Sequence, residues 1–572
     1  MKNKLKFLLA VMAVVIAFLG ISASAATATS GSCGDNLTWS FNSTDGVLTI
    51  SGMGEMDDYA DSSEQPWLEQ SDDITRLIIE EGVTHIGSNA FNGCSALKEA
   101  VIPDTVTYVG EAAFRSCSAM ENVKLPNGET TYGVGVFRSC SSLKKIDIPE
   151  KMTAIPEYMF YYCSSLTNVN FHDNVISIGK GAFGNCFKND SVEVHVTLPK
   201  NLKDIGENAF EYSQMKGITL PVGLTAIGQK AFLRCSKLEK IEIPSTITVI
   251  ENSVFEYCSN LKEISMPSIT QIGNNAFYSI GAEAIVLPEG LKTIGDSAFS
   301  ASKLKEVSFP ESVTQIGAGA FSSTKLEKVT FPGSVEVMSE RTFQRCQSLT
   351  EVVVEEGVTT IGTWAFGYCT KLEKITLPDS VAEIEKNTFT GCSALKSIKI
   401  PENVTIINAI FTNAIALEEI IIQQFVVAID DAAFTGAPKT VVVKGYNGSV
   451  AEKYAQNKGY TFVSLGEITE EIVPAGGQLS DTVKWSLTNT GKLIFSGEGA
   501  VPAMSTVPWK LYENAIKTIV AEEGITSVGK MDFSFTRNIE KVSVHYSVKA
   551  FDENTLKSIV SEAVFEGYSK PG

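Results

Sequence analysis

A phenylalanine recurs through most of the chain at nearly constant spacing, and this repeat restricts the fold more than any other feature. Successive copies are 22 or 23 residues apart, with one gap of 27, at Phe91, Phe114, Phe137, Phe160, Phe183, Phe210, Phe232, Phe255, Phe277, Phe299, Phe321, Phe343, Phe366, Phe389, Phe411 and Phe434. So short a unit does not bury its own apolar side chains, whereas stacked copies bury those of their neighbours. The sequence therefore predicts a solenoid of about sixteen coils.

Each copy has the same order of features, as in ITLPVGLTAIGQKAFLRCSKLEK (residues 218–240). An apolar-x-apolar strand ends at a proline, which lacks an N–H and ends the pairing of strands. A second apolar pair follows and ends in Ile-Gly. The glycine, as at Gly228, Gly295, Gly317 and Gly362, is predicted to supply a permissive turn. The phenylalanines are predicted to stack as a buried column, and the strands to lie parallel.

Ten of the eleven cysteines lie three residues after a repeat phenylalanine, and only Cys33 stands apart. A stack of metal ligands or disulfides between coils is one interpretation. The other is a small buried position, where cysteine behaves as a compact hydrophobe. Copies without cysteine place Ser213, Ser302, Thr324, Ala414 or Ala437 there. This variation favours the small buried position.

The two ends of the chain carry related segments. Residues 31–87 contain NLTWSF, PWLE and ITRLIIEEGVTHIG, and residues 477–529 contain TVKWSL, PWKL and IKTIVAEEGITSVG. Alternating apolar residues in both predict a small β-hairpin module that covers the open edge of a coil. Trp39, Trp67, Trp485 and Trp509 are predicted to form its core. After the last repeat, VVVKGYNGSVAEKYAQNKGYTFVSL predicts a strand, a helix over 450–457 and a closing strand.

At this point the repeats resemble a known family. The segments GVTHIGSNAFNGCSALKEA and GVTTIGTWAFGYCTKLEKI are similar to the BspA-like class of leucine-rich repeats, found in bacterial and protozoal surface proteins. The resemblance implies a β-rich solenoid of 22–23-residue leucine-rich repeats with short parallel strands, a β-type N-terminal cap and a strand-helix-strand C-terminal cap. It also implies adhesion to host proteins or to other cells, but no fixed set of binding residues.

The beginning of the chain has the pattern of an export signal. Three lysines precede an uncharged apolar run from Phe7 to Ile21, and Ala23-Ser24-Ala25 then satisfies a cleavage pattern. No later segment is long and apolar enough to span a bilayer, so we expect a secreted or cell-surface protein with no transmembrane segment after cleavage. The expected divisions are a signal peptide (1–25), an N-terminal β cap module (26–76), the repeat array (77–442), a C-terminal cap (443–465), a linker (466–476) and a second cap module with an incomplete repeat segment (477–572).

Charge and motifs exclude several classes of function. The 47 basic and 66 acidic residues give a formal charge of −19, which disfavours nucleic acid as a partner. The chain has only 4 histidines and none of the sequence motifs of phosphate, dinucleotide or zinc sites. We therefore expect no catalysis, no cofactor and no metal.

The candidate binding residues lie beside the repeat phenylalanines, where residue type varies from copy to copy. Tyrosine, tryptophan and arginine are the types enriched at interface hot spots. An alternative is that these aromatic side chains only pack against neighbouring coils. The candidates are Tyr158, Tyr161, Tyr162, Tyr212, Tyr257, Tyr278, Trp364, Tyr368, Arg115, Arg138, Arg234 and Arg345.

Two functional hypotheses follow. The first is a non-enzymatic protein that recognises or adheres to extracellular or cell-surface proteins of a host or of neighbouring cells. The second is a targeting or structural appendage of a secreted enzyme or surface assembly.

Overall fold

The computed structural model describes residues 29–188, 192–469, 471–513, 515–534, 536, 539–559 and 564–566. The chain divides into two compact units, Met1–Val192 and Glu193–Gly572. The predicted signal peptide lies outside the described residues. Within the described residues, no helix has the length and apolar character needed to cross a membrane.

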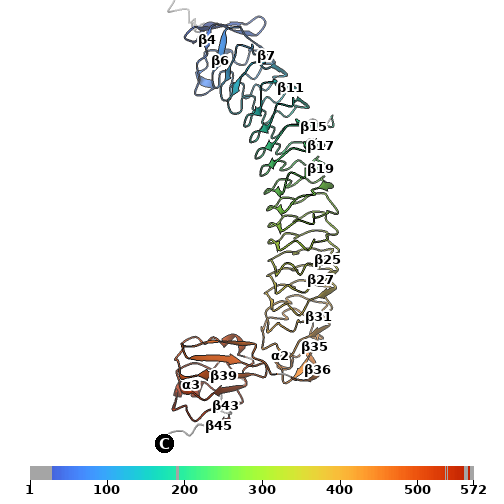
Figure 1. Cartoon of the computed structure of the whole chain (residues 1–572), viewed down its shortest axis with the longest axis vertical. Helices are drawn as coiled ribbons and strands as arrows, with labels where there is room; N and C mark the ends of the chain where they lie inside the picture. Colours follow the sequence, from blue (N-terminus) through green and yellow to red (C-terminus); the bar gives the residue numbers. More distant parts are fainter. Residues whose placement is uncertain are drawn as a thin grey trace, which may run out of the picture. The chain divides into compact units, whose positions relative to one another are not determined.

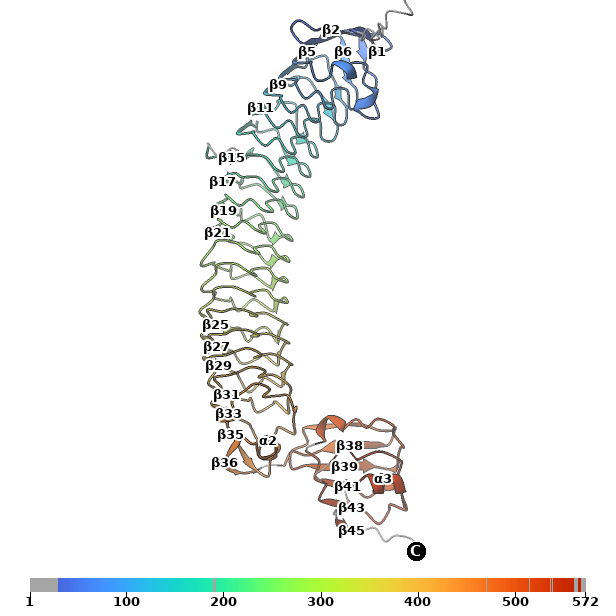
Figure 2. The ribbon, with the colours of Figure 1, turned by 180° about the vertical axis from the view of Figure 1, so that it is seen from behind.

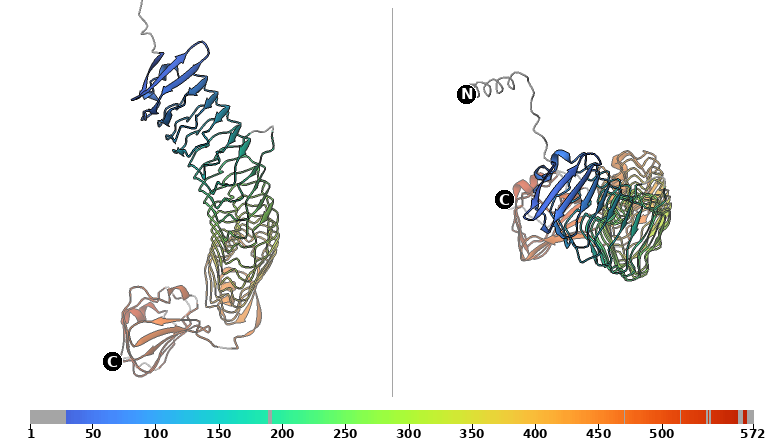
Figure 3. Two further views of the ribbon diagram at one scale, coloured as in Figure 1. Left: turned by 45° about the horizontal axis from the view of Figure 1, so that its top comes forward. Right: turned by 90° about the horizontal axis from the view of Figure 1, so that it is seen from above.

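The first unit begins with an antiparallel sheet that continues as a parallel one. The strands β1 (Ser30–Gly34), β2 (Leu37–Asn42) and β3 (Val47–Gly52) are antiparallel, and β3 pairs in parallel with the first coil (Figures 1 and 3). Two short 3-10 helices follow, η1 (Ser62–Glu64) and η2 (Leu68–Gln70). The first strands of the coils are β5 (Arg76–Ile79), β7 (Glu99–Val101), β9 (Asn122–Lys124), β11 (Lys145–Asp147) and β13 (Asn168–Asn170). The short second strands are β4 (Gly54–Glu55), β6 (Val83–Ile86), β8 (Tyr108–Val109), β10 (Thr131–Tyr132), β12 (Ala154–Ile155) and β14 (Ser177–Ile178).

The second unit has two series of parallel strands of the same kind, and its first strands follow one another along one edge (Figure 2). These first strands are β15 (His195–Thr197), β17 (Gly217–Thr219), β19 (Lys240–Glu242), β21 (Glu263–Ser265), β25 (Lys328–Phe331), β27 (Glu351–Val354), β29 (Lys374–Thr376), β31 (Ser397–Lys399) and β33 (Glu419–Ile421). The second strands are β16 (Asp204–Ile205), β18 (Ala226–Ile227), β20 (Val249–Ile250), β22 (Gln271–Ile272), β23 (Thr293–Ile294), β24 (Gln315–Ile316), β26 (Val337–Met338), β28 (Thr360–Ile361), β30 (Glu383–Ile384), β32 (Ile406–Ile407) and β34 (Ala428–Ile429). The predicted β-solenoid with parallel strands is therefore confirmed.

The core of each unit contains a column of phenylalanine rings. In β19 only the central Ile241 points inward, as expected for a strand with one buried face. The repeat phenylalanines are buried, and rings of successive coils stack with centroids 5.1 to 5.9 Å apart within each unit. Stacked aromatic pairs stabilise beyond the area they bury.

Large side chains cover the ends of this column. In the first unit Trp67 stacks on Phe91 with centroids 5.2 Å apart, and its Nε1 donates to the carbonyl of Ala90 at 3.1 Å. In the second unit Phe434 contacts Tyr454 and Tyr460, with centroids 5.5 and 5.8 Å away. Tyr454 belongs to helix α2 (Val450–Lys458), which is one residue longer than predicted. In the sequence, this helix lies between β35 (Val442–Asn447) and β36 (Thr461–Glu467).

All eleven cysteines are buried, and none of them forms a disulfide with another described cysteine. Thiols of the column donate to the phenylalanine carbonyl of the preceding coil, as Cys258 Sγ does to Phe232 at 3.1 Å. Burial raises the pKa of Cys258 to about 12, so its thiol remains protonated and able to donate. The position is thus a small core slot, as expected, and also a hydrogen-bond donor site.

The glycine after the second strand has a different role from the predicted one. Gly228, Gly295, Gly317 and Gly362 do not adopt the left-handed conformation. A Cβ on Gly295 would lie 2.7 Å from the backbone nitrogen of Asn274, and a Cβ on Gly317 would lie 2.6 Å from that of Asp296. Glycine is required here because adjacent coils approach closely, so the permissive-turn prediction was wrong.

The last part of the second unit repeats the topology of the chain's beginning. Strands β37 (Ala475–Gln478), β38 (Val483–Leu487) and β39 (Lys492–Gly497) are antiparallel, and β39 pairs in parallel with the next strand. The further strands of this sheet are β41 (Thr518–Ala521), β43 (Lys541–Val544) and β45 (Val564–Glu566). The second strands are β40 (Gly499–Val501), β42 (Ile525–Val528) and β44 (Ala550–Phe551), accompanied by η3 (Lys510–Tyr512) and α3 (Glu553–Ser558).

Candidate partner-binding surface

The turn that carries each phenylalanine has an unusual backbone. Around Phe255, the residues two before and two after it, Ser253 and Tyr257, have φ of 58° and 59°. The N–H groups of Ser253, Phe255 and Tyr257 donate at 2.8 to 2.9 Å to carbonyls of the next turn, those of Asn274, Ala276 and Tyr278. The turns therefore form a hydrogen-bonded ladder of their own, and this ladder fixes the left-handed conformation.

The left-handed positions were not foreseen from the sequence. An L-residue with a side chain costs about 1–2 kcal/mol in this conformation, and only glycine and, less often, asparagine or aspartate adopt it routinely. Several copies accordingly have glycine or asparagine there, such as Asn89, Gly93, Asn275 and Gly391. Others have a bulky aromatic or arginine in the same conformation, namely Tyr158, Tyr162, Tyr212, Arg234, Tyr257, Arg341, Arg345, Trp364 and Tyr368. All of these except Arg341 are among the predicted candidates.

The first cluster of candidates lies in the first unit and consists of Arg138, Tyr158, Tyr161 and Tyr162, the 138–162 cluster. Tyr161 makes edge contacts with the rings of Tyr158 and Tyr162, at centroid distances of 5.5 and 4.7 Å. The Arg138 guanidinium lies 5.2 Å from the Tyr161 ring centroid and 5.9 Å from that of Tyr158. Lys188, which was not predicted, lies 6.0 Å from the ring of Tyr162.

The second cluster lies in the second unit and consists of Tyr212, Arg234, Tyr257 and Tyr278, the 212–278 cluster. Arg234 lies 5.3 Å from the Tyr212 ring and 4.5 Å from the Tyr257 ring. Tyr257 in turn meets Tyr278 edge-on at 5.1 Å. Burial, together with the neighbouring Tyr257, raises the pKa of Tyr278, so its hydroxyl remains protonated at neutral pH.

The third cluster, also in the second unit, consists of Arg345, Trp364 and Tyr368, the 345–368 cluster. Trp364 stacks on Tyr368 with centroids 5.6 Å apart and an interplanar angle of 14°. The Arg345 guanidinium lies 6.0 Å from the Tyr368 ring centroid. The rings are only partly covered, and Tyr368 is 41% exposed.

The structure thus places eleven of the twelve candidates in three clusters of aromatic and arginine side chains. Arg115 is exposed and contacts no aromatic ring among the described residues. The rings pack against neighbouring coils, and yet Tyr162, Tyr212, Tyr257 and Tyr368 remain at least 36% exposed.

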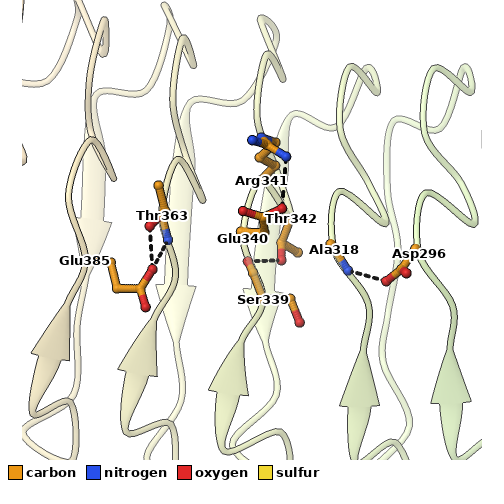
Figure 4. Close-up of polar contacts among 8 residues, drawn as sticks. All are labelled: Asp296, Ala318, Ser339, Glu340, Arg341, Thr342, Thr363 and Glu385. Carbon is orange, nitrogen blue, oxygen red and sulfur yellow. Dashed lines mark hydrogen bonds and ion pairs between the residues drawn. The ribbon is translucent and has the colours of Figure 1, made fainter.

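Polar side chains elsewhere on the coils are used to join one coil to the next. In Figure 4, Asp296 accepts from the backbone N–H of Ala318 at 2.8 Å, and Glu385 accepts from that of Thr363 at 2.7 Å. Glu340, in contrast, pairs with the adjacent Arg341 of its own coil at 2.9 Å. Carboxylates held in this way serve the fold. Within the described ranges, no group of three or more histidine, cysteine or acidic residues is placed to hold a metal ion.

The family assignment follows from a comparison with family models. Six copies of the BspA type leucine-rich repeat region match the chain, at residues 67–190, 184–279, 236–350, 270–389, 322–441 and 508–564. The matches cover well over half of the chain. It therefore belongs to the BspA-type leucine-rich repeat family. No curated protein matches its sequence.

Three of the solved structures that this chain is similar to are of bacterial proteins. A leucine-rich repeat protein from Bacteroides ovatus is 22% identical with a TM-score of 0.49, over 76% of this chain and 99% of that one. One from Eubacterium ventriosum is 24% identical with a TM-score of 0.33, over 72% and 95%. A leucine-rich cell surface protein from Faecalibacterium prausnitzii is 21% identical with a TM-score of 0.25, over 76% and 98%.

Proposed function

We propose that this chain is a secreted or cell-surface protein that recognises extracellular or cell-surface proteins of a host or of neighbouring cells, without catalysis. The three aromatic and arginine clusters are the observation that carries the proposal. Tyrosine, tryptophan and arginine supply most of the energy at protein interfaces, because they bury large areas and keep a polar group for hydrogen bonding. Each cluster presents such side chains at the turn edge of its coils.

The backbone of the clusters adds support. A bulky residue in the left-handed conformation costs free energy that glycine at the same position would not. Strained residues of this kind concentrate at functional sites, where the side chain itself is needed. Tyr212, Arg234 and Tyr257 occupy three such positions in succession along the second unit. A purely structural turn would be better served by the glycine or asparagine found in other copies.

The proposal also assigns roles to the expected divisions of the chain. Residues 1–25 direct export, 26–76 and 443–465 cap the array of 77–442, and 477–572 form a second module joined by the linker 466–476. Trp67 on Phe91 and Tyr454 on Phe434 support the two cap assignments, because each covers a ring that would otherwise end the column.

The test begins with residues 26–572 immobilised and exposed to extracellular matrix proteins and to surface proteins of bacteria and host cells. Bound proteins are identified by mass spectrometry, and Kd is measured by surface plasmon resonance. Replacing Tyr212, Tyr257 and Tyr278 together by serine should weaken binding at least tenfold, while the circular dichroism at the assay temperature remains that of the folded chain. Serine variants of the aromatic residues in the other two clusters, measured in the same way, identify which cluster contacts the bound protein. Tyr546→Ser, which removes a ring that is 78% exposed outside the clusters, is the matched control.

Arginine should act differently from tyrosine. Surface charges act over about a Debye length, roughly 10 Å at 0.1 M salt, and mainly affect the association rate. Arg234→Ser should therefore slow association at low salt more than at high salt. Unchanged affinity in variants of all three clusters would refute the binding surface, and failure of the whole chain to bind any protein would favour the appendage hypothesis.

A further inference from the structure

Strand β36 is the last strand of its sheet, and one of its two sides has no neighbouring strand. The sheet has the order β31-β33-β35-β36, so β36 pairs with β35 on one side only (Figure 2). All of its residues are exposed except Phe462, which is half-buried. Unlike the strands within the stack of coils, β36 therefore has an edge that faces solvent.

The pairing of β35 determines which backbone groups of β36 are free. In a strand, the N–H and C=O of one residue point to the same side, and successive residues alternate between the two sides. Val442 N–H donates to the Glu418 carbonyl at 2.8 Å, so Val442 faces β33. The next residue, Val443, therefore faces β36, where it lies opposite Phe462.

The free groups of β36 follow from this orientation. A residue of a parallel strand bonds to the two neighbours of the residue opposite it. Val443 therefore bonds to Thr461 and Val463, and the N–H and C=O groups of Phe462 and Ser464 point to the open side. In the described part of the chain, neither of these two residues has a backbone partner outside the β35 ladder.

The sequence of this edge has none of the charges or prolines that usually prevent pairing with another chain. Residues 461–465 are TFVSL, and the register of the strand shifts only after Ser464. Val463 and Leu465 are 41% and 43% exposed, although both are apolar. The outer strands of the two hairpin modules, β1 and β37, instead contain two glycines each, which weaken a strand. Of these three outer strands, β36 is the best suited to accept a further strand.

The free groups of β36 are complementary to those of a second copy of the same strand. In an antiparallel pair, two opposite residues of one kind exchange both of their N–H···O bonds. Placing Phe462 opposite Ser464 of a second copy satisfies the free groups of both residues in both copies, with a two-fold axis at Val463. Any other antiparallel register leaves one of the two residues without a partner. No charged residue lies within the paired segment, so like charges do not meet there.

We propose that two copies of this chain associate by antiparallel pairing of their β36 strands across a two-fold axis at Val463. Unpaired N–H and C=O groups at the edge of a sheet are a template for an added strand. The Val463 side chains of the two copies meet at the axis and become shielded from water, with Leu465 beside them. This surface includes none of the aromatic clusters, and the proposal does not depend on the function proposed for them.

The first test captures the pair covalently. Opposite Cα atoms are about 4.5 Å apart in an antiparallel pair of the kind expected at the axis, which is within the range of a disulfide. Val463→Cys in residues 26–572, oxidised mildly at about 0.1 mM, should give at least tenfold more covalent dimer than Val353→Cys. Val353 is the matched control, because it points outward from β27, which has a paired strand on both sides. The native cysteines are buried, so the introduced thiol is the one that reacts.

The second test uses the chain without an added cysteine. So short a pairing is much smaller than a standard interface, and we expect a weak dimer whose Kd is measured by sedimentation equilibrium. Val463→Lys should raise that Kd at least tenfold by placing two cations at the axis, whereas Val353→Lys should leave it unchanged. Circular dichroism checks that both variants are folded.

Hydrogen exchange tests the backbone pairing itself. The amides of Phe462 and Ser464 should exchange fast in dilute solution and more slowly at the concentration of the dimer, whereas the Val463 amide should be slow in both. A chain that stays monomeric, or that dimerises equally well after Val463→Lys, would overturn the proposal. Protection of Phe462 and Ser464 only after an extracellular protein is added to a monomeric chain would assign the edge to a strand of that protein, and would equally overturn pairing between two copies.

Discussion

The phenylalanine column and the left-handed positions beside it lie within five residues of each other in every coil, yet they follow opposite rules. At Phe255 the side chain is fixed by the core and the backbone is ordinary. At Ser253 and Tyr257 the backbone is fixed by the turn ladder, and the side chain is free to vary. The core column therefore maintains the fold, while the flanking positions are free to diversify.

The largest expected effect comes from the column. Phe255→Ala or Phe277→Ala, in the middle of the second unit, should lower the free energy of unfolding by about 3–5 kcal/mol, because each leaves a cavity between two stacked rings. Tyr257→Ala should cost well under half as much, since that ring is 36% exposed. Urea titration followed by circular dichroism measures both. Equal losses at Phe255 and Tyr257 would contradict the contrast between buried and exposed positions.

Much of the fold was predictable because repetition reveals the core. Sixteen phenylalanines at nearly constant spacing indicate a column, and a proline after the apolar pair of most copies indicates where a strand ends. The left-handed turn was not predicted, although asparagine and glycine at the flanking positions, as in Asn89, Gly93 and Asn275, are its signal. The glycine after the second strand was wrongly assigned to a turn. Its actual cause, the close approach of the backbones of adjacent coils, depends on how the coils stack and is not visible in the sequence of one coil.

The candidate site was predictable by residue type but not by arrangement. Tyrosine and arginine beside each phenylalanine could be listed from the sequence, but their grouping depends on which coils are adjacent and on the direction that the left-handed backbone gives each side chain. Lys188, outside the repeat pattern, joined the 138–162 cluster for this reason.

The next effect in size concerns the cysteine column, which lies beside the phenylalanines and shares their burial. Cys258→Ala removes the donor to the Phe232 carbonyl and should cost about 1–3 kcal/mol, the penalty for a buried acceptor without a partner. Burial raises the pKa of the Cys258 and Cys392 thiols to about 12, so neither forms a thiolate at pH 8. Because all eleven cysteines are buried, we expect no labelling of the folded protein by a thiol reagent at pH 8, and labelling of all eleven in denaturant. Rapid labelling of the folded chain would show that this column is open to solvent.

The same raised pKa sets the direction of a pH dependence. Unfolded thiols, with pKa near 9.0, lose their protons before the folded ones, with pKa about 12, so the folded state loses stability as pH rises through this interval. The contribution is complete below pH 9. Melting temperature measured from pH 7 to 11 should fall most steeply above pH 9, and the fall should be smaller in a variant with Cys235, Cys258 and Cys392 replaced by serine. If the melting temperature of the variant has the same pH dependence as that of the unchanged chain, the buried thiols are not the cause of the fall.

The smallest expected effect is an increase in the free energy of unfolding, and it tests the left-handed positions directly. Ser323 has φ of 60°, and its N–H donates to the Gln344 carbonyl at 2.8 Å. Ser323→Gly keeps that hydrogen bond and removes the steric cost of the conformation, about 1–2 kcal/mol, while adding the entropy that glycine loses on folding. We therefore expect a net gain of about 0.5–1 kcal/mol in the free energy of unfolding. Ser348→Gly, at a residue of the next coil with ordinary backbone, should instead lose about 0.5–1 kcal/mol, because only the entropic term applies there. Opposite shifts in the two urea midpoints would show that the turn ladder fixes the backbone regardless of the side chain. A lower midpoint in both variants would mean that serine adopts the left-handed conformation at Ser323 without strain, and that the bulky residues of the clusters are not strained either.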